Sequence, residues 1–226
     1  KLKARTSKVH PNRLQRRRML PPLTSADSLM KEGEASGAFI RARMIFSLIQ
    51  TYRVAIMDLT IREAVLEDAD WFLALNAANT PAVGPLDIDR LRALEDQSHA
   101  VMIAEDGQGE RLGALVVLAP GREYFSLNYR WFERELDSFL YIDRVMVAES
   151  GRRKGVGVAL YAEALELAEQ HGADQLAAEV NITPPNPVSM AFHERMGFSR
   201  IGDQQLPDGK HVDMLTRKVL NPQAAG

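Results

Sequence analysis

A short basic loop between a strand pattern and a helix pattern constrains the fold of this chain more than any other feature. The loop reads Arg152-Arg153-Lys154-Gly155-Val156-Gly157. The stretch before it, 140–147, is apolar enough for a β-strand, and the stretch after it, to about His171, has apolar residues at helical spacing. Such a strand-loop-helix unit is typical of layered folds that combine a sheet with helices.

The same loop has the chemistry of an anion-binding site. The first turn of a helix leaves backbone N–H groups without partners, and the helix dipole adds about half a positive charge there. Glycines at 155 and 157 let the backbone approach an anion closely, and three basic residues add formal charge, which favours a pyrophosphate site. A plain turn with solvated charges is the competing interpretation, because the loop lacks the Gly-Lys-Ser/Thr of a Walker motif and the third glycine of a dinucleotide fingerprint.

Periodicity elsewhere predicts the remaining elements. Strands are expected at 59–62, 100–105, 112–118, 176–180, 198–202 and 211–219, and helices at 67–76, 87–96 and 186–196. Asp87 is expected to cap the second of these helices. The alternation of hairpins with helical crossovers predicts an α/β layered fold with a mixed sheet.

A second motif follows the basic loop after one helix and one strand. It reads Asn186-x-x-Ser189-x-x-x-His193-x-x-x-Gly197-Phe198. Together, this motif and the Arg-x-x-Gly-x-Gly loop resemble the two signatures of the GNAT acetyltransferase superfamily, and the resemblance covers roughly residues 59–219. It implies the GNAT fold, a central mixed, largely antiparallel sheet of about seven strands flanked by about four helices. Three further stretches are similar to a little-characterised bacterial subgroup of predicted acetyltransferases: 128–132, 141–144, and 179–181 with the Pro184-Pro185-Asn186-Pro187 that follows.

The resemblance implies an N-acetyltransferase that uses acetyl-CoA, needs no metal and acetylates a primary amine of a small molecule or peptide by direct attack. It assigns the backbone N–H groups from Arg153 to Val158 to the pyrophosphate, and the strand edge near Val145 to Val147 to the pantetheine arm. Asn186 is expected near the thioester end. The complete set expected to bind the cofactor is Val145, Met146, Val147, Arg152, Arg153, Lys154, Gly155, Val156, Gly157, Val158, Asn181, Asn186, Ser189 and His193.

Acyl transfer needs a neutral amine, whereas an amine with an ordinary pKa near 10.4 is neutral in only about one molecule in 10³ at pH 7. A carboxylate, or a water that it holds, can remove the proton. Asp143 and Glu179 are the alternatives for this catalytic base, and Tyr141 shares a face with Asp143 and could order a water. Arg144 is expected to project to the opposite face from Asp143.

The departing thiolate benefits from a proton donor, for which the family commonly has Tyr where this chain has His193. An imidazole can still donate, so a donor or thiol contact and a histidine without a catalytic role are the alternatives. Tyr161 and Tyr141 are substitutes for the donor. A backbone N–H at Met146 or Val147 is expected to stabilise the oxyanion. The His193 departure also keeps open a non-catalytic acyl-CoA-binding sensor or regulatory module.

A polar-aromatic insert at 121–138 precedes the strand at 140–147. Its aromatic side chains could wall an acceptor pocket, and its acidic residues could attract a cationic acceptor. The alternative is an amphipathic helix that covers the sheet. The chain has no cysteine, which excludes disulfides, thiolate metal sites and a Cys nucleophile.

Charge divides the chain into two unequal parts. Residues 1–56 hold 12 Lys or Arg against 3 Asp or Glu, and we expect a disordered or non-native extension there, with a basic binding arm or a targeting segment as alternatives. Residues 57–226 are expected to form the GNAT domain, with Met57 as a natural start. This part is acidic, which argues against nucleic-acid binding, and no apolar run reaches about 18 residues, which argues against a membrane partner. We expect a cytoplasmic protein and consider a homodimer.

Overall fold

A computed structural model of the chain describes residues 59–219. Seven strands form one sheet in the order β1-β2-β3-β4-β5-β7-β6. The strands are β1 (Thr60–Glu63), β2 (Ala100–Glu105), β3 (Arg111–Leu118), β4 (Leu140–Val147), β5 (Gln175–Thr183), β6 (Ser199–Gln205) and β7 (His211–Lys218). Only β4 and β5 pair in parallel, and every other neighbouring pair is antiparallel. The predicted mixed, largely antiparallel sheet of seven strands is confirmed.

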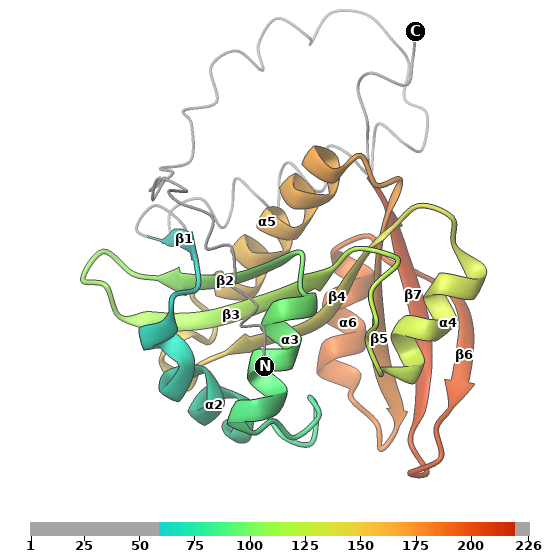
Figure 1. The fold of residues 1–226 in the computed structure, drawn as a ribbon, viewed down its shortest axis with the longest axis horizontal. Helices are drawn as coiled ribbons and strands as arrows, with labels where there is room; N and C mark the ends of the chain where they lie inside the picture. The colour runs from blue at the N-terminus through green and yellow to red at the C-terminus, as the bar shows by residue number, and fades with distance from the viewer. Residues whose placement is uncertain (1–58, 220–226) are drawn as a thin grey trace, which may run out of the picture.

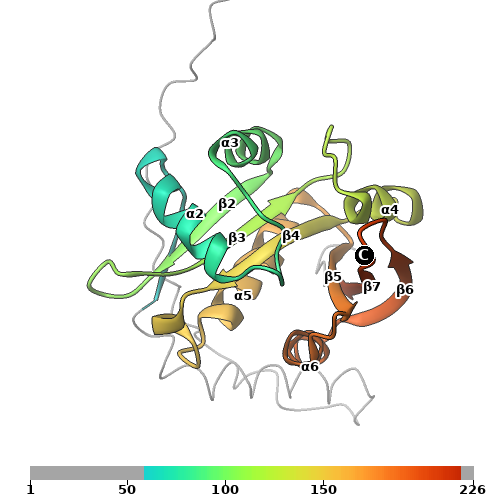
Figure 2. The same ribbon diagram turned by 90° about the horizontal axis from the view of Figure 1, so that it is seen from below.

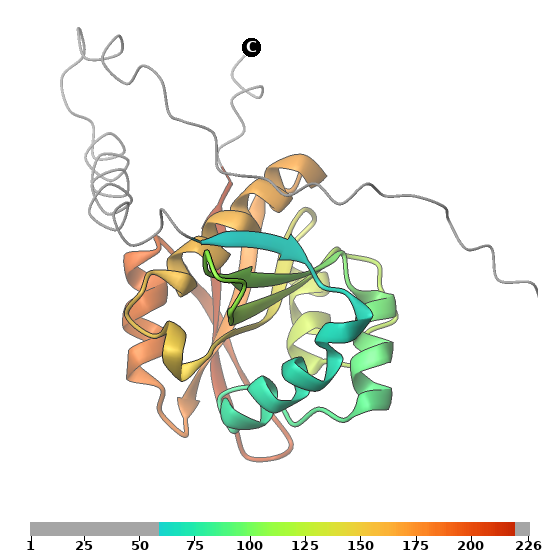
Figure 3. The ribbon, with the colours of Figure 1, turned by 90° about the vertical axis from the view of Figure 1, so that its left-hand side faces the viewer.

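Helices cover both faces of this sheet (Figures 1 and 2). The helices α5 (Val156–His171) and α6 (Pro187–Arg195) lie on one face. On the other face lie α2 (Ala69–Ala78), α3 (Ile88–Gln97) and α4 (Leu127–Glu135), and Figure 3 shows the sheet edge-on between the two layers. Two single 3₁₀ turns, η2 (Leu66–Asp68) and η3 (Glu149–Gly151), precede α2 and α5. Asp87 caps α3 as predicted, since its side chain accepts from the Arg90 N–H at 2.9 Å.

The described part has one α-helix more than the four expected, and this additional helix, α4, comes from the insert between β3 and β4. Helix α4 buries Asn128, Tyr129 and Phe132, and Ser126 caps its first turn. The alternative of an amphipathic helix over the sheet is therefore the one that the structure bears out. The sequence predicted about four helices because the aromatic residues of the insert suited a pocket wall equally well.

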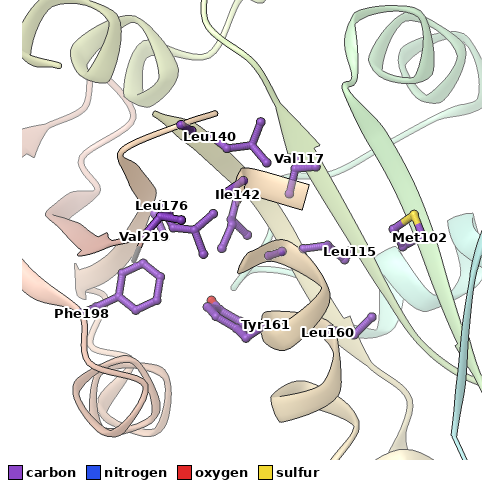
Figure 4. Close-up of a cluster of buried hydrophobic side chains, with 14 of the residues drawn as sticks. Met102, Leu115, Val117, Leu140, Ile142, Leu160, Tyr161, Leu176, Phe198 and Val219 are labelled. Atoms are coloured by element: carbon purple, nitrogen blue, oxygen red, sulfur yellow. The ribbon is translucent and has the colours of Figure 1, made fainter. Parts of the chain in front are cut away.

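The core consists of two apolar clusters, one on each face of the sheet. The first packs α5 against the sheet, and Figure 4 shows Leu160 and Tyr161 of α5 beneath Leu115 and Ile142 of the strands. The second packs α2, α3 and α4 against the opposite face and contains Tyr141. Strand residues therefore alternate between the two clusters, which fixes the face on which each polar side chain of β4 and β5 lies.

No helix in residues 59–219 is both long enough and apolar enough to cross a membrane.

Candidate active site

The strands β4 and β5 pair only at their first residues and then diverge. The register joins Leu140 to Leu176 and Tyr141 to Ala177, and no further pair follows. Parallel strands normally remain bonded along their length, so this early separation leaves one edge of β4 open. The resemblance implied a free strand edge near Val145 to Val147, although the strand pattern itself carries no signal for where pairing stops.

The open edge presents the backbone groups of two β4 residues. Ala148 N–H donates to Leu112 O at 2.9 Å, which directs Ala148 toward β3. Successive residues of an antiparallel strand alternate between their two neighbours, so Met146 also bonds to β3, while Val145 and Val147 face the side that β5 has left. Of the two N–H groups expected to stabilise an oxyanion, Val147 therefore has the one that a ligand can reach.

The N-terminus of α5 lies after this edge and has a backbone conformation that suits an anion. Gly155 caps the helix with φ of 80°, and Arg153 also has a positive φ of 61°. Alternating right- and left-handed residues turn successive N–H groups inward, which makes a concave anion site. No other described residue accepts a hydrogen bond from the N–H groups of 155–158. The exposed basic side chains of 152–154 form no ion pair within residues 59–219.

Gly157 leaves space above the first turn of α5. A Cβ added there would meet nothing nearer than the Phe192 ring at 3.6 Å, which is ordinary van der Waals contact. Packing within the chain does not require a glycine at this position. The absence of a side chain instead leaves the first-turn amides accessible, as a pyrophosphate needs.

Asp143 lies at a β-bulge and is fully engaged by its neighbours. Val116 pairs with Arg144 and Val117 with Ile142, so Asp143 has no partner on β3. Its Oδ1 accepts from the Tyr124 hydroxyl at 2.6 Å, and its Oδ2 accepts from Arg144 Nε at 2.7 Å.

The expectation that Arg144 projects away from Asp143 is wrong. The extra residue of the bulge breaks the alternation, so that two consecutive side chains lie on the same face. Arg144 Nη1 also donates to Asn76 Oδ1 of α2 at 2.6 Å. Asp143 and Arg144 thus form a buried ion pair that is hydrogen-bonded to α2, and both oxygens of Asp143 accept a hydrogen bond.

Glu179 lies on the same face of the sheet as Asp143. It is two residues beyond Ala177, the last residue of β5 that pairs with β4. Its Oε1 accepts from Asn128 Nδ2 at 2.9 Å, and its Oε2 accepts from the Tyr141 hydroxyl at 2.8 Å. Burial, and then the negative charge of Asp143, raise the pKa of Glu179 to about 7, although the two hydrogen bonds act in the opposite direction. A carboxylate with such a pKa exchanges a proton readily near neutral pH.

The Tyr141 hydroxyl is a donor to Glu179 and holds its proton firmly. Burial and the neighbouring carboxylates of Glu179 and Asp143 raise the pKa of Tyr141 far above its ordinary value. The sequence placed Tyr141 beside Asp143, but its hydroxyl bonds to Glu179 across the diverging strands.

His193 forms a buried pair with Tyr161. The Tyr161 hydroxyl lies 2.5 Å from Nε2, and Nδ1 lies 2.8 Å from Ser189 O. A carbonyl oxygen only accepts, so Nδ1 carries the proton and Nε2 accepts from Tyr161. Burial lowers the pKa of His193, which keeps the ring neutral at pH 7. Phe198 packs edge-on against both rings, at 5.7 Å from Tyr161 and 5.2 Å from His193.

The second sequence motif also shapes the start of α6. Asn186 caps the helix through Oδ1, which accepts from the Ser189 N–H at 3.1 Å. Its own N–H donates to Asn181 O at 3.0 Å, which links the cap to the end of β5. These bonds give Asn186 and Ser189 a structural role that sequence alone did not separate from cofactor contact.

Two polar residues of the site, Asn128 and Gln204, were not predicted, and Tyr124 was expected only as a possible wall of an acceptor pocket. Asn128 and Gln204 join the surroundings of Glu179, and Tyr124 bonds to Asp143. Asn128 stood at the start of one of the stretches similar to the bacterial subgroup, which was the only sequence signal for it. Within residues 59–219, no group of three or more His, Asp or Glu side chains is placed to hold a metal ion.

Known proteins resemble this chain in sequence and in fold. The model of the family described as Acetyltransferase (GNAT) family matches residues 66–198. Ard1 from Thermoplasma volcanium is similar in fold, with 20% identity and a TM-score of 0.59 over 73% of this chain and 99% of that chain. A search of curated protein sequences gave no match.

Two further structures are similar. A GNAT superfamily phosphinothricin acetyltransferase from Sinorhizobium meliloti, in complex with AcCoA, has 19% identity and a TM-score of 0.56 over 75% of this chain and 93% of that chain. The ribosomal-protein-S18-alanine N-acetyltransferase from Escherichia coli has 15% identity and a TM-score of 0.53 over 71% of this chain and 94% of that chain. At these identities the similarity establishes the fold.

Proposed function

Because the chain belongs to the acetyltransferase (GNAT) family, we propose that it transfers the acetyl group of acetyl-CoA to a primary amine of a small molecule or peptide by direct attack of that amine. Acetyl-CoA, when bound, supplies the activated acyl group. The acceptors named for the similar structures differ from one another, so they support an amine as the acceptor and no particular one.

The residues around α5 fit the cofactor. The unpaired amides of 155–158, the space above Gly157 and the exposed cations of 152–154 suit a diphosphate. The open edge of β4 at Val145 and Val147 suits the amide-bearing pantetheine arm, which would bond to it as an added strand. The Val147 N–H is our candidate for stabilising the oxyanion.

We assign the general base to Glu179 rather than to Asp143. Asp143 is paired with Arg144 and accepts from Tyr124, so both of its oxygens already bind donors of the chain itself. Glu179 is held by two neutral donors and has a pKa of about 7, so it is both populated as a carboxylate and able to accept the amine proton. This carboxylate beside the divergence of β4 and β5 is the observation that carries the proposal.

His193 is not the proton donor in this account. Its Nδ1–H is committed to Ser189 O, and Nε2 has a lone pair rather than a proton. The pair with Tyr161 instead joins α6 to α5 beside the cofactor-binding edge. The departing thiolate then takes its proton from solvent, because a thiol has an ordinary pKa near 8.5 and needs little help to leave.

The test is release of CoA from acetyl-CoA in the presence of a mixed panel of amines. Because the chain has no cysteine, a thiol reagent reports only the released CoA. We expect turnover by the wild-type protein and a loss of about 10²-fold or more in Glu179→Gln, with the affinity for acetyl-CoA unchanged by calorimetry. Full activity of Glu179→Gln would remove Glu179 as the base.

A non-catalytic acyl-CoA-binding module is the second candidate, and the neutral His193 at the position of the usual Tyr favours it. The same experiment separates the two functions. A pure binding module would take up acetyl-CoA but release no CoA above background with any amine of the panel.

A further inference from the structure

Two side-chain amides in series link β6 to Glu179 by way of helix α4. Gln204 Nε2 of β6 donates to Asn128 Oδ1 at 2.8 Å, and Asn128 Nδ2 donates to Glu179 Oε1 at 2.9 Å. The three residues come from β6, α4 and β5, and Asn128 lies 51 residues before Glu179 and 76 before Gln204 in the sequence, but the three elements meet on one face of the sheet (Figure 1).

Helix α4 packs closely against β6 where the Trp131 ring lies over Gly202. A Cβ at Gly202 would lie 2.7 Å from the Trp131 ring, so this position accepts the ring only because it is a glycine. Gln204 follows two residues later on the same strand and the same face. The contact between Trp131 and Gly202 therefore fixes the distance across which Gln204 and Asn128 bond.

The direction of these two hydrogen bonds determines which end of the Asn128 side-chain amide faces Glu179. An ionised Glu179 can only accept, so it takes the Nδ2 donor of Asn128, and Gln204 Nε2 donates to the remaining Oδ1, which holds the Asn128 amide in that orientation. A reversed amide would present an oxygen to Glu179, and an ionised carboxylate cannot donate to it. The orientation thus stabilises the ionised form of Glu179 against burial and against Asp143.

We propose that Asn128 and Gln204 are positioning residues of the active site, which act in series to orient the Glu179 carboxylate and to keep it ionised. The inference rests on the proposed function, because Glu179 is the base there. The insert between β3 and β4 is then part of the catalytic apparatus as well as a cover for the sheet.

The other groups that face Glu179 define the background for the test. From β4 come Tyr141, which donates to Oε2, and Asp143, whose charge is balanced by Arg144. Burial, and then the charge of Glu179, raise the pKa of Tyr161 on α5. On β7 the register partner of Glu179 is the apolar Met214. From α4 and β6, the described polar groups that act on Glu179 are the side-chain amides of Asn128 and Gln204.

The experiment follows the titration of Glu179 by ¹³C NMR of its side-chain carboxyl, in parallel with the pH dependence of kcat/KM, in the full chain. The variants are Asn128→Ala, Gln204→Ala and Gln204→Glu. The matched control is Gln205→Glu, because Gln205 is the exposed neighbour of Gln204 on β6 and makes no hydrogen bond through its side chain to another described residue.

Removal of the Asn128 donor should raise the NMR midpoint of Glu179 by about one to two pH units, the equivalent of one hydrogen bond to a charged group. Gln204→Ala should shift it in the same direction by less. Gln204→Glu should shift it further than Gln204→Ala, because an acidic side chain repels Oδ1 and favours the reversed amide. Gln205→Glu should leave the midpoint within a few tenths of a unit of wild type.

Unchanged NMR midpoints in both Gln204 variants would overturn the inference, and so would equal shifts in Gln204→Glu and Gln205→Glu, because a general charge effect would then explain them. The Gln204 variants carry the test if Asn128→Ala does not fold, since Gln204 is only partly buried. The proposed function fails separately, if the wild type releases no CoA above background with any amine of the panel, and the base assignment fails by full activity of Glu179→Gln, whatever the midpoints of the amide variants.

Discussion

The carboxylates of Asp143 and Glu179 lie on neighbouring strands but have different hydrogen-bond partners. This difference is the basis of the roles that we propose for them. Asp143 faces a guanidinium and a phenol, whereas Glu179 faces only a phenol and an amide. A cation stabilises an ionised carboxylate more than neutral donors do, so Glu179 is the one whose pKa stays high. Asp143 contributes to this result, since its charge is the second cause of the raised pKa of Glu179.

Replacement of Asp143 by Asn should therefore lower the pKa of Glu179. The repulsion disappears and Arg144, no longer paired, adds an attraction. We expect an ascending limb of kcat/KM near pH 7 in the wild type, from the pKa of about 7 for Glu179, and a limb at lower pH in Asp143→Asn. A limb that stays in place or moves upward would contradict the electrostatic link between the two carboxylates. Chemical unfolding should show a loss of stability of a few kcal/mol, because a buried guanidinium loses its partner.

Glu179 should also make the stability of the protein depend on pH. Its folded pKa of about 7 lies above the ordinary 4.5, so the protonated form is favoured by folding. That stability is present below pH 4.5 and is lost as the pH rises through 7. The Gln side chain of Glu179→Gln stays neutral at every pH. The unfolding free energy of this variant, relative to that of the wild type, should therefore rise by up to about 3 kcal/mol between acidic and alkaline pH. Parallel urea titrations at acidic and alkaline pH check this, and a constant difference between the two proteins would contradict it.

At the scale of elements, the helices and strands followed from periodicity, while the site depended on how two strands separate. The loop at 152–157 could be predicted because glycines, charges and the helix pattern are all local. The Asp143–Arg144 pair could not, because one extra residue in β4 reverses the expected face. The amide chain to Glu179 could not either, since its partners lie on α4 and β6 and meet only in the folded sheet.

The pair between α5 and α6 gives a prediction at this scale. Tyr161→Phe keeps the ring that packs on Phe198 but leaves His193 Nε2 without a donor. We expect a loss of about 1–3 kcal/mol in unfolding free energy, with kcat within a few-fold of wild type. Urea unfolding and steady-state kinetics measure the two quantities. A fall of about 100-fold in kcat would instead identify the Tyr161 hydroxyl as the proton donor.

At the scale of the whole molecule, the cofactor groups and the base belong to different layers. The amides of α5 and the Tyr161–His193 pair lie on one face, Glu179 and α4 lie on the other, and the diverging ends of β4 and β5 join them (Figure 2). Under the proposed function, the cofactor and the amine would approach from opposite faces of the sheet and meet at the open edge. The expected extension at 1–56 lies outside the described residues, and the cytoplasmic location and the homodimer stay predictions.

The domain division can be tested by removal of residues 1–56. If residues 57–226 hold the whole acetyltransferase, the shortened chain should bind acetyl-CoA and release CoA at rates within about twofold of the full chain. Calorimetry and the thiol assay measure both. A large loss of either property would show that the first segment takes part in the site, contrary to the domain boundary that we expect at Met57.

The most direct test of the account is calorimetric titration of acetyl-CoA into the wild type, Gly157→Asp and Ala162→Asp. The space at Gly157 admits a side chain, and an aspartate in the first turn stabilises a helix by itself, so Gly157→Asp should fold well. It should nevertheless bind acetyl-CoA at least about tenfold more weakly, because its carboxylate meets the diphosphate. Ala162→Asp adds the same charge at an exposed position of α5 and should bind like the wild type. Equal affinity of all three proteins would contradict the cradle at the start of α5, and with it the assigned binding mode.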